Sequence, residues 1–181
     1  SNTWLQGARV VPSENYDDRP LACEIELIVL HAISLPPEQF GGGYVEKFFT
    51  NSLDWKAHEY FQGLRGLRVS SHLFVNRCGA VTQFVELDKR AWHAGDSIWN
   101  GRKACNDFSI GIELEGSDSQ PYEREQYLSL IELLGNMFAL YPLLNVDSVV
   151  GHSDVSPGRK TDPGPFFDWN YLRTEIGNFN S

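Results

Sequence analysis

The feature that most constrains the fold is an alternating segment near the middle of the chain, DFSIGIELEG at residues 107–116. Its alternate positions are apolar: Ile110, Ile112 and Leu114. The positions between them are small or acidic: Ser109, Gly111, Glu113 and Glu115. Successive side chains of a β-strand point to opposite faces. The segment therefore predicts a strand with an apolar face toward the core and a carboxylate face toward a cleft or solvent.

Other apolar runs predict further strands. CEIELIVLH at residues 23–31 is typical of a buried strand, with His31 at its C-terminal end. Residues 69–76 and 80–87 flank a short polar turn and predict a hairpin. DSVVGH at residues 147–152 predicts a short strand that ends at His152.

Helical periodicity is strongest over residues 122–141, where apolar residues recur at three- and four-residue steps until Pro142 stops the pattern. A short helix over about 44–50 follows a glycine-rich loop. Asp168 is expected to cap a last helix in which apolar residues share one face. Strands and helices are interspersed, which predicts an α+β (mixed α/β) fold with a central mixed β-sheet flanked by helices.

Length and charge narrow the class of protein. The chain has 181 residues, which favours a single domain over 1–181 with its core at about 9–175. A net charge of −9 argues against nucleic acid and anionic membranes as partners. No run approaches the ~20 apolar residues of a membrane span, and the opening SNTWLQGARV lacks the apolar core of a signal peptide. Together with only three cysteines, this predicts a cytoplasmic location.

Two histidines and one aspartate suggest a metal site. His31 and His152 each end a predicted strand, and Asp162 follows His152 by ten residues in the Pro- and Gly-rich segment GHSDVSPGRKTDPGP. Two imidazoles and a carboxylate make a three-ligand zinc site with a fourth position open for water and substrate. Each residue alone also fits a structural role, and His72 and His93 compete as ligands.

Three charged residues are candidates for the chemistry beside such a metal. Glu113 projects from a strand interior on the polar side and is the best candidate for a general base. Glu115 shares that face but lies nearer the strand end, where it also fits a supporting or solvated carboxylate. Lys160 lies two residues before Asp162 and is placed to stabilise an oxyanion. Each also fits an ordinary charged surface position.

Four segments together resemble a known family. They are VLHAISLPPEQFGGGYV, LRVSSHLFVNRCGAVTQFVELDKRAWHAGDS, CNDFSIGIELEG and GHSDVSPGRKTDPGPFFDW. They look like the cytosolic 1,6-anhydro-N-acetylmuramyl-L-alanine amidases of the AmpD type, relatives of phage amidase lysozymes and peptidoglycan recognition proteins. The resemblance extends over about residues 9–175.

The resemblance implies a zinc-dependent hydrolase of peptidoglycan recycling and cell wall degradation in bacteria. By position it implies zinc ligands His31, His152 and Asp162, and catalytic residues Glu113 and Lys160. The substrate is then a small anhydromuramyl peptide.

The expected site also has substrate-binding walls. Arg68 is the candidate for holding a substrate carboxylate, and Trp92 and His93 for lining the pocket. Two alternatives stay open: a peptidoglycan-recognition module that does not cut, and a secreted or phage-type amidase acting on intact cell wall.

Overall fold

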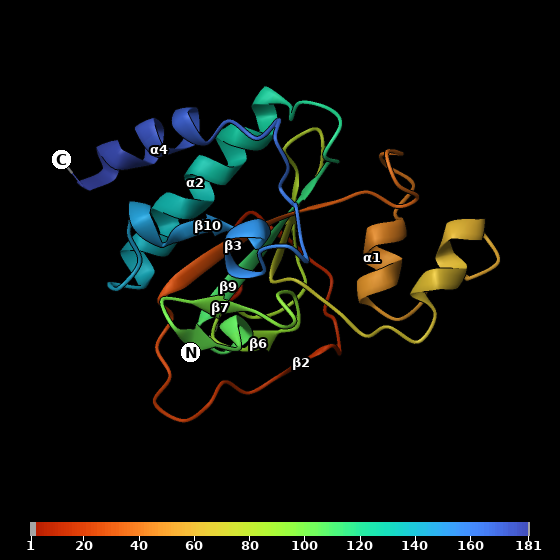
Figure 1. Cartoon of the computed structure of the whole chain (residues 1–181), viewed down its shortest axis with the longest axis horizontal. Helices are drawn as coiled ribbons and strands as arrows, with labels where there is room; N and C mark the ends of the chain where they lie inside the picture. Colours follow the sequence, from red (N-terminus) through yellow and green to blue (C-terminus); the bar gives the residue numbers. More distant parts are fainter. Residues whose placement is uncertain (1–2, 181) are drawn as a thin grey trace.

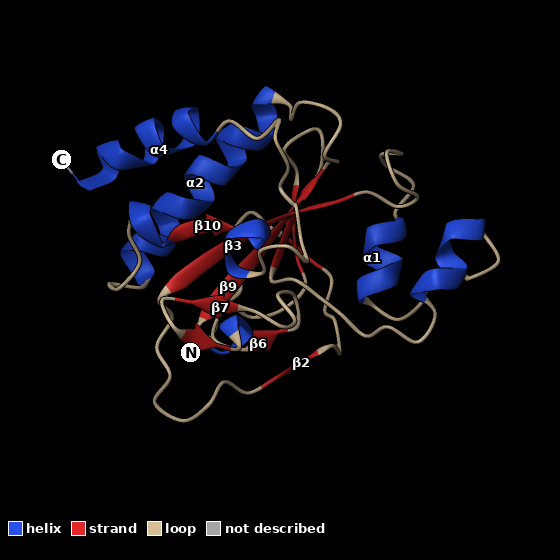
Figure 2. Cartoon of the chain, in the orientation of Figure 1, coloured by secondary structure: helices blue, strands red, loops and turns tan. Residues whose placement is uncertain are grey.

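Six strands form a central sheet in the order β1-β5-β4-β9-β3-β10 (Figures 1 and 2). The structure, a computed structural model, describes residues 3–180. Its strands are β1 Arg9–Val10, β2 Tyr16–Asp17, β3 Leu27–Ile33, β4 Leu73–Val75, β5 Val81–Gln83, β6 Arg90–Ala91, β7 Ile98–Trp99, β8 Arg102–Lys103, β9 Ser109–Glu115 and β10 Val149–Gly151. Its α-helices are α1 Tyr44–Phe49, α2 Arg124–Leu140, α3 His152–Val155 and α4 Trp169–Gly177. Short 3-10 helices are η1 Glu59–Leu64, η2 Cys105–Asp107, η3 Val146–Ser148 and η4 Asn178–Asn180.

The sheet is mixed, as the sequence predicts. Only β4 and β5 pair antiparallel within it, and they form the expected hairpin. The other neighbours pair parallel: β1 with β5, β4 with β9, β9 with β3, and β3 with β10. Because β9 lies inside the sheet between β4 and β3, every residue of β9 is buried, including both of its carboxylates.

Helices α2 and α4 cover one face of this sheet and lie side by side in Figure 1. The apolar positions of β9 pack there in one cluster with the buried stripe of α2, and both elements agree with their predicted periodicity. Asp168 caps α4 as expected, since its side chain accepts a hydrogen bond from the Tyr171 N–H. Pro142 follows two residues after α2 ends.

The opposite face carries the polar positions of β9 and a second set of apolar contacts. Helix α1 packs together with η1 on aromatic residues of β4 and of the segment after β5. In Figure 1 it lies at the right, whereas α2 and α4 lie at the left. Phe49 of α1 meets Phe84 edge to face, with ring centroids 5.2 Å apart. The α1–η1 layer therefore covers this face on the side of β4 and β5.

Two predicted strand ends were misplaced. The strand expected at 23–31 is β3, Leu27–Ile33, because β9 and β10 offer no pairing partner to residues before Leu27. His31 therefore lies inside the strand, two residues before its end. His152 is not the last residue of β10 but the first of α3. Among the described residues, no helix is long and apolar enough to span a bilayer.

Candidate active site

His31, His152 and Asp162 converge on one point of the polar face. The two Nδ1 atoms of His31 and His152 lie 2.9 Å apart. Asp162 Oδ2 lies 3.3 Å from His31 Nδ1 and 3.2 Å from His152 Nδ1. They are the one group of potential metal-ligating side chains that the described residues bring together in this way.

Strand register accounts for the pairing of the two histidines. Gly151 of β10 is paired in parallel with Leu30 of β3, so the residue that follows each of them, His152 at the start of α3 and His31 in β3, comes level on the same face. His31 is in turn paired with Glu113 of β9. Three functional candidates from distant parts of the chain thus meet because three parallel strands lie side by side.

The Pro- and Gly-rich loop brings Asp162 back to this point. The Ser153 N–H donates to the Asp162 carbonyl (3.0 Å), and the Tyr122 hydroxyl donates to the Pro163 carbonyl (2.7 Å). A Cβ atom at Gly151 would lie 2.8 Å from Pro163 Cδ, so glycine lets the loop pack closely against the end of β10. These contacts hold the carboxylate beside the two imidazoles.

The electrostatics of the three residues favour a cation. Burial lowers the pKa of His31, and contact with the Asp162 carboxylate only partly offsets that shift. Burial alone would raise the pKa of Asp162, but contact with the imidazoles of His152 and His31 holds it well below the usual carboxyl range. Near neutral pH the cluster therefore holds a neutral imidazole at His31 and an ionised carboxylate, which is the protonation state that divalent metals require.

Glu113 lies beside the cluster with one oxygen unsatisfied. Its Oε1 lies 3.9 Å from His31 Nδ1. Its Oε2 is buried and has no hydrogen-bond partner among the described residues. Burial, and then the negative charge of Asp162, raise the pKa of Glu113 well above its usual value, while Lys160 acts in the opposite direction. A buried carboxylate without a partner, facing a cavity, is poised to exchange a proton with a bound molecule.

A cavity of about 590 Å³ opens over these groups. Lys160, Trp92 and His93 line it together with the three clustered residues and Glu113. The Trp92 indole N–H donates to Asp17 Oδ1 (3.1 Å), which leaves the ring as part of the wall. His93 Nδ1 lies 2.9 Å from His31 Nε2, so His93 contacts the cluster itself as well as the cavity.

Three other predicted candidates lie elsewhere. His72 is fully buried and is not a competing ligand, because the Gly111 N–H donates to its Nδ1 (3.0 Å) and its Nε2 lies 2.8 Å from the Lys89 carbonyl. Glu115 is not solvated either: it accepts hydrogen bonds from the Gly41 and Arg77 N–H groups.

Arg68 does not line the cavity, although both of its chain neighbours do. It lies 3.9 Å from Glu14 and donates to Asn15 instead. This conformation does not place its guanidinium at the cavity wall.

Sequence reasoning missed two contributors. The Ala94 carbonyl lies 3.0 Å from His152 Nε2, and since a carbonyl only accepts, His152 carries its proton on Nε2 and presents a bare Nδ1. Gly111 lies in the interior of β9, where an added Cβ would lie 2.4 Å from His93 Cγ. A glycine inside a strand is a known mark of close approach and was the available signal.

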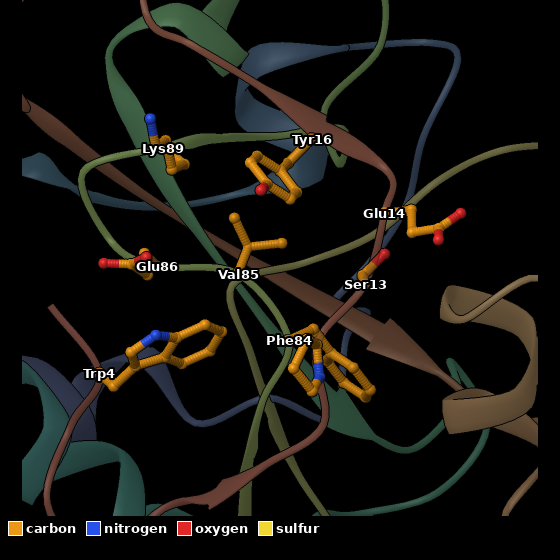
Figure 3. Close-up of a pocket in the computed structure, with 9 residues that line it drawn as sticks. Trp4, Ser13, Glu14, Tyr16, Phe84, Val85, Glu86 and Lys89 are labelled. Carbon is orange, nitrogen blue, oxygen red and sulfur yellow. The ribbon is translucent and has the colours of Figure 1, made fainter. Parts of the chain in front are cut away.

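A second cavity, of about 580 Å³, lies near the N-terminal segment. Figure 3 shows the rings of Trp4 and Tyr16 on either side of Val85, with Glu86 and Lys89 nearby. The residues described as lining it include no histidine and no cysteine. It therefore lacks the groups for the chemistry that the first cavity offers.

Comparison with known proteins gives the class. The family model described as N-acetylmuramoyl-L-alanine amidase matches residues 21–165, a range that contains every strand of the central sheet except β1 and ends just past Asp162. The chain belongs to the N-acetylmuramoyl-L-alanine amidase family and is an enzyme of that class, a hydrolase.

Within the family, the chain is similar to one kind of member. It is 52% identical to the 1,6-anhydro-N-acetylmuramyl-L-alanine amidase AmpD of Haemophilus influenzae, over 95% of this chain and 94% of that protein. It is 49% identical to AmpD of Escherichia coli K12, over 96% and 94%.

Solved structures agree in fold. A crystal structure of an AmpD selenomethionine derivative superposes with a TM-score of 0.94 at 47% identity, covering 97% of this chain and 98% of that one. The amidase AmiD of E. coli, in complex with the substrate anhydro-N-acetylmuramic acid-L-Ala-D-γ-Glu-L-Lys, superposes at 0.62 with 28% identity, over 90% and 66%.

Proposed function

We propose that this chain hydrolyses the amide that joins the lactyl group of 1,6-anhydro-N-acetylmuramic acid to L-Ala of the stem peptide, as a step of peptidoglycan recycling. The observation that carries the proposal is the convergence of His31, His152 and Asp162 beside the unpartnered Glu113 Oε2, in the lining of a cavity of about 590 Å³. AmpD relatives at about half identity over nearly the whole chain support this substrate class.

His31 Nδ1, His152 Nδ1 and a carboxylate oxygen of Asp162 would hold zinc. Ligand atoms of a tetrahedral zinc ion lie about 3.3 Å from one another, and these three lie 2.9–3.3 Å apart. The bare Nδ1 of His152 and the ionised Asp162 fit that ion. Zinc supplies Lewis-acid chemistry at such a site: it lowers the pKa of water toward about 7 and polarises a carbonyl.

Two residues of this chain then assist the reaction: Glu113 transfers the proton, and Lys160 stabilises the negative charge. Glu113 takes a proton from the attacking water, whose oxygen bonds to the lactyl carbonyl carbon. It passes that proton to the amine of L-Ala as the C–N bond breaks, leaving a carboxylic acid and a free amine, which ionise to a carboxylate and an ammonium group in water. The Lys160 ammonium on the cavity wall stabilises the negative charge that develops on the carbonyl oxygen.

The remaining cavity residues orient the substrate. The Trp92 ring offers an apolar wall, and His93 lines the cavity beside His31. The role of Arg68 as a ligand for a stem-peptide carboxylate stays a prediction that requires its guanidinium to leave Glu14 and Asn15.

We also propose that the reaction takes place in the cytoplasm. The support is chemical: Cys23, Cys78 and Cys105 are all free thiols, which suits a reducing compartment. Cell fractionation with an antibody against the chain tests this directly, and recovery in the periplasm or medium would contradict it.

One experiment separates the hydrolase from its alternatives. The zinc-loaded protein is incubated with anhydromuramyl tripeptide and, separately, with polymeric cell wall, and the products are identified by mass. Release of free tripeptide from the small fragment alone supports the proposal. Release from the polymer would indicate a wall amidase, and binding without any cleavage would indicate a recognition module.

A further inference from the structure

Two consecutive residues, His93 and Ala94, contact the Nε2 atoms of His31 and His152. His152 Nε2 donates to the Ala94 carbonyl, and His31 Nε2 lies 2.9 Å from Nδ1 of His93. The Asn106 side chain fixes this segment, since its Oδ1 accepts from the N–H groups of both residues (3.2 and 2.8 Å). The segment therefore acts as one support for the outer nitrogens of both imidazoles.

The contacts couple the proton positions of His31 and His93. If His31 presents a bare Nδ1 to a metal, its Nε2 must carry the proton and needs an acceptor. His93 Nδ1 is that acceptor. The proton of His93 is then on Nε2, which lies 3.1 Å from the Ser109 hydroxyl oxygen, so that hydroxyl accepts it. In this arrangement the Nε2–H groups of His31, His93 and His152 each have an acceptor, and the Nδ1 atoms of His31 and His152 face Asp162.

The His93 ring fits beside His31 because Gly111 has no side chain. It lies on β9 between Ser109 and Glu113, and a Cβ atom there would lie 2.4–2.7 Å from three atoms of the His93 ring. The ring is otherwise held edge to face against His31, with centroids 5.0 Å apart. A side chain at position 111 would therefore have to displace His93.

We propose that His93 is a positioning residue: by accepting a hydrogen bond from His31 Nε2, it fixes His31 in the tautomer that leaves Nδ1 free to bind the metal. This inference rests on the proposed metal site and deepens it. Outer partners of this kind orient ligating histidines, and their loss typically weakens metal binding about 10- to 100-fold.

The test compares two substitutions of His93 in the full-length protein. His93→Asn keeps an acceptor near the position of Nδ1, whereas His93→Leu fills similar space without one. Long-range ¹H–¹⁵N correlation spectra of the metal-free proteins report which nitrogen of His31 is protonated. We expect Nε2–H in the wild type and in His93→Asn, and loss of that preference in His93→Leu. Zinc Kd, measured by competition with a chromophoric chelator, should rise about 10- to 100-fold in His93→Leu and much less in His93→Asn.

Gly111→Ala gives a second route that does not remove His93. It should weaken zinc binding by a similar factor in the wild type, but add little in a His93→Ala background, because its effect acts through the His93 ring. An additive loss in the double variant would overturn the inference. If His93→Leu fails to fold, this cycle and the His93→Asn spectra still decide.

Two results would overturn the positioning role outright: a proton on Nδ1 of His31 in the metal-free wild type, or unchanged zinc Kd in His93→Leu. Failure of the proposed function looks different. If the wild type binds no zinc, or His31→Ala leaves zinc binding intact, the metal site itself is wrong. If zinc binds but no anhydromuropeptide is cleaved, the reaction is wrong while the His93 result stands.

Discussion

Acidification should destabilise the metal-free protein through His72, a buried imidazole outside the proposed metal site. The His72 side chain accepts from the Gly111 N–H at Nδ1, so its Nε2–H donates to the Lys89 carbonyl and the ring is neutral. Burial, and then the positive charge of Arg19, lower the pKa of His72 to about 3. Protonation at Nδ1 would oppose two N–H groups and break this arrangement.

The direction and size of this pH effect follow from the difference in proton binding between the folded and the unfolded chain. An unfolded histidine has a pKa of about 6.5, so between that value and about 3 the unfolded chain binds a proton at His72 that the folded chain does not. The contribution of His72 to the free energy of unfolding is therefore fully present above pH 6.5 and is lost as the pH falls. One proton corresponds to about 1.4 kcal/mol per pH unit, so about 2 kcal/mol is lost between pH 7 and pH 5.

The assay is urea unfolding of metal-free wild type and His72→Gln, followed by tryptophan fluorescence at pH 7, 6 and 5. Glutamine keeps an acceptor and a donor but does not titrate. His31 and His93 also have lowered pKa values but contribute to both proteins, so their effect largely cancels in the difference. The free energy of unfolding of wild type relative to the variant should fall by about 2 kcal/mol from pH 7 to pH 5. Parallel pH profiles for the two proteins would refute the reasoning.

Four further substitutions test the site. Glu113→Gln should lower kcat on anhydromuramyl tripeptide about 10²- to 10⁴-fold at unchanged zinc content, because an amide cannot accept the proton of water; wild-type kcat would end its assignment as the base. Lys160→Ala should lower kcat and leave zinc Kd nearly unchanged, whereas loss of zinc would point to a structural role. Asp162→Ala should release zinc during gel filtration, as elemental analysis reports, and full retention would exclude it as a ligand. Glu115→Gln should lower the melting temperature rather than kcat, since its carboxylate accepts two backbone N–H bonds, each worth about 2 kcal/mol; a lowered kcat at unchanged stability would contradict that role.

The candidate residues could be predicted because their signals are local. Alternation along residues 109–115 shows that Glu113 shares a face with Gly111 before any partner strand is known. Pro and Gly around Asp162 indicate a stiff loop without showing where it leads. Strand ends were predicted less well. The extent of β3 depends on where its partner strands β9 and β10 begin, and the residues around His31 do not indicate those positions.

The sequence by itself determined the mixed sheet, the long helix α2 and the set of side chains able to bind a metal, because periodicity and side-chain chemistry are properties of neighbouring residues. Only the tertiary structure decided which histidines meet. It set His152 level with His31, turned His72 toward backbone partners, placed His93 behind His31 and left Arg68 beside Glu14. Those outcomes depend on the register of parallel strands and on close packing between segments far apart in the chain, and no local pattern encodes either.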